Sequence, residues 1–183
     1  MGLTGVTRHN VGRIAERIVS NELEYRGFRV SDLNKERTAA NADLLAARDG
    51  KTWQIQVKGA TEDYGGTWFG YGYCTDAIID KKEPMFNRSA SSFYEAQIVV
   101  LVSVKTPKEY SCVVLPVEIT EKAAQINLDY AYRTPKKDGG PKKPSLVWCE
   151  FDYIPPKMDD KKKARLKEEQ ELLRPYRDNW DIK

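Results

Sequence analysis

The residues best suited to chemistry lie around one Asp-Gly pair, at positions 49 and 50. Such a pair between two apolar stretches favours a two-residue type I′ turn, because both turn positions need positive φ. Strand positions then face each other when their numbers sum to 99, so we expect Asp43 to face Gln56. Lys58 projects from the same face about 7 Å further along the strand. A carboxylate, an amide and an amine are therefore predicted within reach of one small ligand.

A second carboxylate, Glu16, lies on a segment with helical periodicity. Residues 11–25 are predicted to form an amphipathic helix, with Asn10 as its N-cap and Gly27 as its stop. Glu16 borders the apolar stripe, so it joins Asp43 only if the helix packs beside the hairpin. A solvent-facing position is the alternative for Glu16, and an ordinary solvated hairpin face is the alternative for the other three. The apolar stripe is Val11, Ile14, Ala15, Ile18, Val19 and Leu23.

Hydrolysis of a phosphodiester is the chemistry that this set could perform. It needs a nucleophilic water molecule and stabilisation of charge at the phosphate and at the leaving oxygen. Mg²⁺ prefers oxygen ligands and could orient and activate that water. Asp43 would be the principal Mg²⁺ ligand, and Glu16 would bind directly or through water. The Gln56 amide oxygen and the Val57 main-chain carbonyl would complete the site. Lys58 would hold the phosphate or help to deprotonate the water.

A glutamine at position 56 stands where an acid would be the stronger ligand. A neutral amide binds Mg²⁺ less tightly than a carboxylate and acidifies water differently. Two carboxylates, Asp43 and Glu16, remain beside one lysine, Lys58. That set can still hold a cation, particularly when a DNA phosphate adds negative charge.

The elements that must position these residues can be read along the chain. Strands are predicted at about 28–31, 97–105, 110–117 and 145–151, in addition to the hairpin at about 42–58. Helices are predicted at 89–95, 119–130 with Thr120 as a cap, and 160–173. The glycine-rich stretch 59–74 is predicted to form irregular or edge structure or a second hairpin. This order predicts an α/β fold, with a central mixed β-sheet flanked by helices, in a single domain over residues 1–183.

The composition excludes several classes of site. The chain has one histidine and three scattered cysteines with no CxxC pair, which argues against a zinc site, a Ser-His-Asp triad or a disulfide framework. No apolar run approaches the roughly 18 residues of a membrane span, and the first residues lack the apolar core of a signal peptide. We therefore expect no membrane partner and a cytoplasmic protein with reduced thiols.

A basic stretch near residue 140 could contact nucleic acid. The net charge of +3 permits such a partner without requiring it. The basic residues of the predicted loop could bind phosphates, although a merely solvated loop is the alternative. Four aromatic residues at 68–73 could stack on bases, and core packing of an edge hairpin is the more ordinary use. The residues proposed for nucleic-acid binding are Arg133, Lys136, Lys137, Lys142 and Lys143.

The residues already named resemble the PD-(D/E)XK, or restriction-endonuclease-like, nuclease superfamily. Its pattern is a helix glutamate, a strand aspartate and then (D/E)-x-K on the next strand. Here the pattern reads AERIV with Glu16, NADLLA with Asp43, and QIQVKG with Gln56 and Lys58. The chain departs from it at Gln56, which replaces an acid, and at Ala42, which replaces a proline. A Q-x-K version is known among some restriction enzymes and intron-encoded homing endonucleases.

The resemblance covers about residues 11–59, and it implies more than the residues do alone. It implies a restriction-endonuclease-like core, Mg²⁺-dependent cleavage of DNA with Mn²⁺ as a substitute, double-stranded DNA as partner, and often a homodimer. Restriction, homing, phage and repair enzymes all fit this pattern. The alternative is a module on the same fold with a degenerate site, which binds nucleic acid or a partner without cleaving it.

Overall fold

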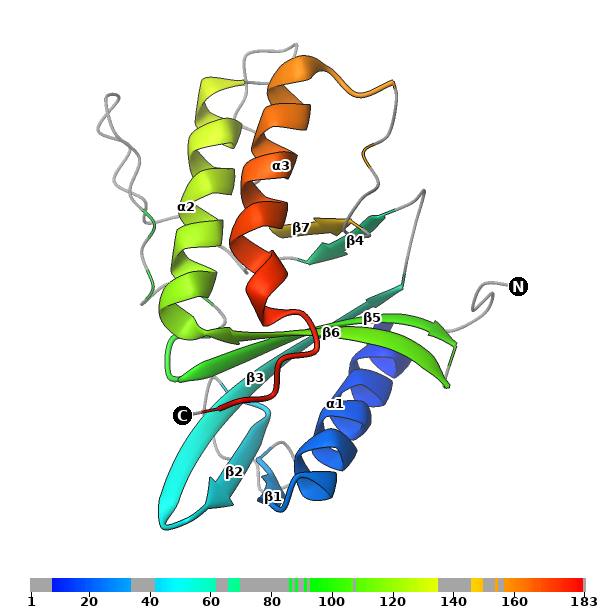
Figure 1. The fold of residues 1–183 in the computed structure, drawn as a ribbon, viewed down its shortest axis with the longest axis vertical. Helices are drawn as coiled ribbons and strands as arrows, with labels where there is room; N and C mark the ends of the chain where they lie inside the picture. The colour runs from blue at the N-terminus through cyan, green and yellow to red at the C-terminus, as the bar shows by residue number, and fades with distance from the viewer. Residues whose placement is uncertain are drawn as a thin grey trace.

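Three helices and seven strands form the part of the chain that the computed structural model describes (Figure 1). The described residues are 8–33, 42–61, 66–69, 86, 88, 91, 93–106, 108–134, 146–149, 154 and 157–182. The helices are α1 (Arg8–Tyr25), α2 (Val117–Arg133) and α3 (Asp160–Leu173), followed by a 3₁₀ turn η2 (Arg174–Tyr176). The strands are β1 (Arg29–Asp32), β2 (Leu44–Arg48), β3 (Lys51–Thr61), β4 (Gly66–Phe69), β5 (Ile98–Thr106), β6 (Glu109–Pro116) and β7 (Leu146–Cys149). None of the described helices has the length and apolar character to cross a membrane.

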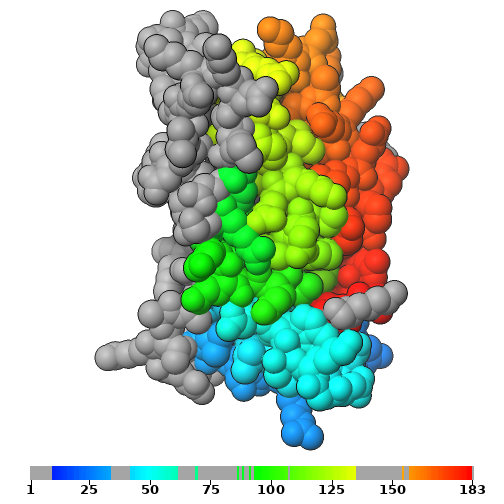
Figure 2. All heavy atoms as spheres, turned by 90° about the vertical axis from the view of Figure 1, so that its left-hand side faces the viewer, coloured from blue at the N-terminus to red at the C-terminus, as the bar shows by residue number. Residues whose placement is uncertain are grey.

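Five of the strands form one mixed sheet in the order β1-β2-β3-β5-β6. Strand β3 pairs in parallel with β5, and the other neighbours pair antiparallel. Helix α1 covers one face of this sheet, while α2 and α3 lie side by side over the other (Figure 1). From a second side, Figure 2 shows the β2–β3 hairpin in cyan at the lower end of the molecule, below α2 and α3. The predicted α/β fold is confirmed, and its helix-flanked mixed sheet is the arrangement expected of a restriction-endonuclease-like core.

The β2–β3 hairpin has the turn that its sequence predicts. Asp49 has φ of 51° and Gly50 has φ of 75°, so both turn residues lie in the left-handed region that a type I′ turn requires. The register follows from the turn, with Leu45 opposite Gln54. Side chains alternate along β3 because the strand is pleated. The predicted register of this hairpin is confirmed.

Each face of the sheet has its own apolar core. Because cross-strand partners share a face, the register separates the two sets. The core beneath α1 contains Val11, Ala15, Ile18, Val19 and Leu23 of the helix with Trp53, Ile55, Val57, Ile98, Val100 and Val102 of the sheet. The core beneath α2 and α3 contains Val99, Leu101, Val113 and Leu115 of the sheet with Ala123, Ala124 and Leu173 of the helices. The chain alternates between these two cores along β5, which explains its near-continuous apolar sequence.

Helix α1 stops in the way the sequence predicts, but it begins earlier. Gly27 has φ of 82°, and its N–H donates to the Glu24 carbonyl at 2.9 Å. The Phe28 N–H donates to the Leu23 carbonyl at 3.1 Å, which completes a Schellman motif. The helix already includes Arg8, so Asn10 lies inside its first turn and the prediction of an Asn10 cap was wrong.

The residues after η2 close the outer edge of the sheet. Arg177 forms an isolated antiparallel bridge with Val113 of β6. The Asp178 N–H donates to the Cys112 carbonyl at 2.8 Å, and the Cys112 N–H donates to Asp178 Oδ1 at 3.0 Å. Trp180 and Ile182 then enter the core beneath α1. This segment pairs with β6 where the strand would otherwise present unpaired backbone groups.

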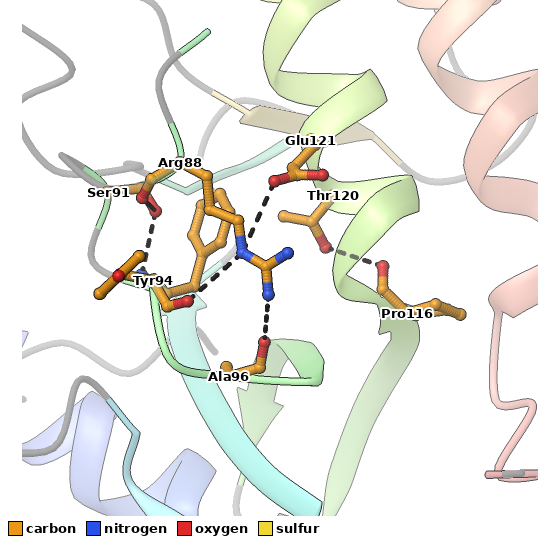
Figure 3. A network of polar contacts seen from close by, with 8 residues as sticks. Arg88, Ser91, Tyr94, Ala96, Pro116, Thr120 and Glu121 are labelled. Carbon is orange, nitrogen blue, oxygen red and sulfur yellow. Dashed lines mark hydrogen bonds and ion pairs between the residues drawn. The ribbon is translucent and has the colours of Figure 1, made fainter. Parts of the chain in front are cut away.

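The segment before β5 is a turn held to α2, where the sequence predicted a short helix over 89–95. Residues 91 and 93–95 adopt bend and turn conformations. The Arg88 guanidinium donates to the carbonyls of Tyr94 at 3.3 Å and Ala96 at 3.2 Å (Figure 3). Its Nε also lies 3.6 Å from Glu121 Oε1 on α2. These side-chain bonds satisfy carbonyls that an isolated turn would leave to water.

Strand β4 lies in the stretch predicted to be irregular structure, edge structure or a hairpin, and among the described residues it pairs antiparallel with β7, far along the chain. The prediction of a Thr120 cap was wrong. Helix α2 begins at Val117, directly after Pro116, so Thr120 lies inside the first turn. Its hydroxyl donates to the Pro116 carbonyl at 3.4 Å instead of capping the helix. Pro116 is the N-cap residue of α2, and no side chain caps this end of the helix.

Candidate functional site

Asp43 is held by its main chain at the point where β2 begins. Its N–H donates to the Ile55 carbonyl at 2.9 Å, and its carbonyl accepts the Leu33 N–H at 3.0 Å. These bonds join Asp43 to β3 on one side and to the end of β1 on the other. The aspartate is therefore placed by the sheet, so its side chain starts from a fixed position beside β3.

The Asp43 carboxylate turns back onto β3. Its Oδ2 accepts the Val57 N–H at 2.7 Å and also accepts a hydrogen bond from Gln56 Nε2. Gln56 is 6% exposed, so water competes little for these bonds. The predicted pairing thus brings Asp43, Gln56 and the Val57 main chain into direct contact.

The charges of two carboxylates, Asp43 and Glu16, act on Lys58. Burial lowers the pKa of Lys58 below its usual value, because an ammonium group loses hydration there, while the charges of Asp43 and Glu16 raise it in part. Lys58 and Gln56 share the sheet face of Leu101 and Val99, their partners on β5. Helix α1 covers the opposite face of the sheet, and Glu16 acts on Lys58 through its charge.

The titration of Lys58 should report this arrangement. We expect its pKa, followed by NMR of a ¹³C-lysine-labelled protein and assigned with Lys58→Arg, to lie below 10.5. The unfolded chain then binds more protons between the folded pKa and 10.5, so stability should rise with pH in that window. Asp43→Asn should lower the pKa further, because it removes the charge that raises it. An unchanged or higher pKa in Asp43→Asn would contradict the geometry.

Gly59 allows α1 to approach β3, and the sequence did not reveal it. A Cβ at this position would lie 2.6 Å from the Ala15 Cβ and 2.9 Å from the Val11 carbonyl oxygen. Ala15 precedes Glu16 and Gly59 follows Lys58, so the helix acid and the strand lysine are each next in sequence to this contact. The sequence placed Gly59 in an irregular stretch, whereas β3 runs on to Thr61. A glycine directly after a strand lysine was the available signal, because strand glycines often mark close backbone approach.

The residues gathered here fit Mg²⁺ by ligand type. Carboxylate, amide and main-chain carbonyl oxygens are the ligands that hard divalent cations prefer. No cluster of three or more His, Cys, Asp or Glu that could hold a metal occurs among the described residues. A cation at this place would therefore depend on two acids, Asp43 and Glu16, supplemented by neutral oxygens of Gln56 and Val57. Such a set carries less negative charge than an all-acid site, which favours weak rather than tight binding.

The basic residues predicted to bind nucleic acid do not all fall in the described structure. Arg133 is exposed and is the last residue of α2. The helix leaves the sheet at Val117, so Arg133 lies roughly 24 Å along its axis from that point. The structure thus does not bring Arg133 to the Asp43 cluster. The other four, Lys136, Lys137, Lys142 and Lys143, lie outside the described residues.

Comparison with known proteins adds two solved structures. No protein-family model matches the chain, and no curated protein sequence matches it. The chain is similar to a bacterial homing endonuclease, I-Ssp6803I, with 14% identity and a TM-score of 0.48, over 95% of this chain and 90% of that one. It is also similar to the crystal structure of MepB, with 13% identity and a TM-score of 0.36, over 91% of this chain and 98% of that one. The case for a function therefore depends on the residues of the site.

Proposed function

We propose that this protein is an Mg²⁺-dependent DNA endonuclease that hydrolyses phosphodiester bonds. One observation carries the proposal: the Asp43 carboxylate bonds to Gln56 and to the Val57 N–H, beside Lys58 and within reach of the Glu16 charge. These are the positions of the helix-glutamate, strand-aspartate and (D/E)-x-K pattern that the sequence resembles, with Gln56 in place of the second acid. The Glu16 charge acts on the same lysine as that of Asp43, which an incidental set of polar residues on a hairpin would not require.

Each residue has a distinct task in the proposed reaction. Asp43 and Glu16 would hold the cation with the Gln56 and Val57 oxygens, and bound Mg²⁺ would supply charge neutralisation and acidify a water molecule. Lys58 would contact the scissile phosphate and hold the water in place. Its lowered pKa would let a fraction of the amine accept a proton nearer neutral pH. The partial burial of the cluster would strengthen each of these electrostatic contacts.

Incubation of the purified protein with supercoiled plasmid tests the proposal. We expect nicked or linear DNA in the presence of Mg²⁺ or Mn²⁺ and intact plasmid with EDTA, because the cation supplies the charge that the protein lacks. Linear DNA varied in sequence and structure should be included, since a selective enzyme would leave one plasmid uncut. The absence of cleavage on every substrate, with folded protein, would reject the endonuclease.

The same experiment tests two further parts of the proposal. They are that the substrate is double-stranded DNA and that the enzyme acts as a homodimer. Two copies of the site would face the two strands, so linear product should form without a long-lived nicked intermediate. Sedimentation at the assay concentration checks the dimer directly. A monomer that only nicks would retain the hydrolysis but reject the dimer.

A non-catalytic nucleic-acid-binding module is the second candidate. One observation favours this module: Gln56 is neutral, and its amide is hydrogen-bonded to the Asp43 carboxylate beside which an active site would place a second acid. This candidate predicts DNA binding that needs no divalent cation and persists in Asp43→Ala. Gln56→Glu separates the two, because a weak nuclease should gain activity while a binding module should be indifferent.

A further inference from the structure

The Gln56 side-chain nitrogen occupies the point where two oxygens converge. Its Nε2 donates to Asp43 Oδ2 and to the Val57 carbonyl, the latter at 3.4 Å. One oxygen belongs to an acid and the other to the main chain of β3. Both are oxygens that a divalent cation would need. The amide NH₂ group, with its two partly positive hydrogens, therefore stands where the positive charge of a cation would be expected.

The amide orientation follows from the chemistry of its neighbours. The nitrogen end of a glutamine carries two donors and the oxygen end carries none. An amide turned the other way would press its oxygen against the Asp43 carboxylate, and the repulsion would replace two hydrogen bonds. With a cation between the oxygens this preference reverses, because only the amide oxygen can then be a ligand. The same side chain thus suits both states after a half-turn about its last bond.

We propose that Gln56 is a reversible stand-in for the cation, whose NH₂ group bridges Asp43 and Val57 until a divalent cation displaces it and takes the amide oxygen. This inference rests on the proposed function for its cation, and it concerns the residue at which the chain departs from the acidic pattern. The amide keeps a half-buried carboxylate hydrogen-bonded without metal. A glutamate could not do so, since two adjacent carboxylates repel each other.

The proposal predicts how tightly the site binds metal. Entry of the cation must break the two hydrogen bonds made by Gln56 Nε2. The cost of breaking them reduces the net free energy of cation binding. Gln56→Glu should therefore bind Mg²⁺ at least about tenfold more tightly than the natural chain. The same variant should be less stable without metal, because position 56 then repels Asp43. The matched control is Gln54→Glu, which adds the same charge on the same face of β3 two residues away and should leave Mg²⁺ affinity nearly unchanged.

NMR of the Gln56 side-chain NH₂ group tests the stand-in directly, with ¹⁵N-labelled protein and signals assigned by their loss in Gln56→Glu. We expect the metal-free NH₂ protons to exchange slowly with water, and Mg²⁺ to speed that exchange by about tenfold or more. The Val57 N–H, which donates to Asp43, reports Mg²⁺ binding independently of the amide. Release of the NH₂ group in step with the Val57 signal would support the proposal.

The other outcomes overturn it. Rapid NH₂ exchange without metal would mean that the bridge does not form. A protected NH₂ group that stays protected while the Val57 signal moves would mean that the cation binds elsewhere. No movement of either signal at millimolar Mg²⁺ would mean that no exchange with a cation takes place. Plasmid cleavage with no release of the NH₂ group rejects the stand-in alone, and release without cleavage on any DNA rejects the endonuclease alone.

Discussion

Asp43→Asn is expected to reduce plasmid cleavage by about 10²–10³-fold or more, with the fold intact. Asparagine has the shape of aspartate and can still accept the Val57 N–H, so the main chain of β3 should keep its position. It lacks the charge that a cation requires, and its own NH₂ group would face the Gln56 amide. The rate of loss of supercoiled plasmid, measured at saturating Mg²⁺ and Mn²⁺, gives the effect.

The matched control for Asp43→Asn lies on the same hairpin. Asp49 is exposed and lies in the turn with positive φ, a conformation that asparagine adopts readily. Asp49→Asn should leave cleavage unchanged while removing the same charge. If Asp43→Asn kept natural activity, or if both variants lost it equally, the observed cleavage would belong to another site or to a contaminant.

Gly59→Ala is expected to destabilise the protein by about 1–3 kcal/mol and to reduce cleavage as well. The added Cβ would meet the Ala15 Cβ at 2.6 Å and the Val11 carbonyl at 2.9 Å, and neither can rotate out of the way. Helix α1 must therefore move off the sheet, and Glu16 moves with it, away from Lys58. Urea unfolding measures the stability, and the plasmid assay measures the activity.

Gly12→Ala is the control for this substitution. Gly12 lies in the same helix, and a Cβ there would meet nothing within 4 Å. Alanine should stabilise α1 by about 0.5–1 kcal/mol, because glycine is the poorer helix former. Opposite signs for the two Gly→Ala changes are the expected signature of a close helix–strand contact. A neutral Gly59→Ala would show that α1 does not depend on that contact.

The parts of the site that the sequence predicted are those fixed by neighbouring residues. The Asp-Gly turn sets the register of β2 and β3 by itself, so the alignment of Asp43 with Gln56 could be derived by counting. The approach of α1 could not, because it depends on packing of Gly59 against residues far away in sequence. The parallel pairing of β3 with β5 was beyond the same reasoning, since no turn joins the two strands.

The orientation of the Gln56 amide could not be predicted from the sequence. The sequence predicts that Gln56 faces Asp43 and that its amide oxygen is a candidate Mg²⁺ ligand. Its actual orientation depends on two acceptors, the Asp43 carboxylate and the Val57 carbonyl, which meet only in the folded chain. A sequence can name a side chain with both a donor and an acceptor, but the surrounding atoms decide which end is used.

The segment that pairs with β6 also bears on how the protein is made. Trp180 and Ile182 complete the core beneath α1, and the guanidinium of Arg26, the residue after α1, stacks over the Trp180 ring at 5.1 Å from its centroid. A ribosome releases α1 and the β2–β3 hairpin long before it adds these two residues. During that interval the apolar face of α1 in the nascent chain packs against an incomplete core. The core beneath α1 is therefore complete only once the chain has extended through Ile182.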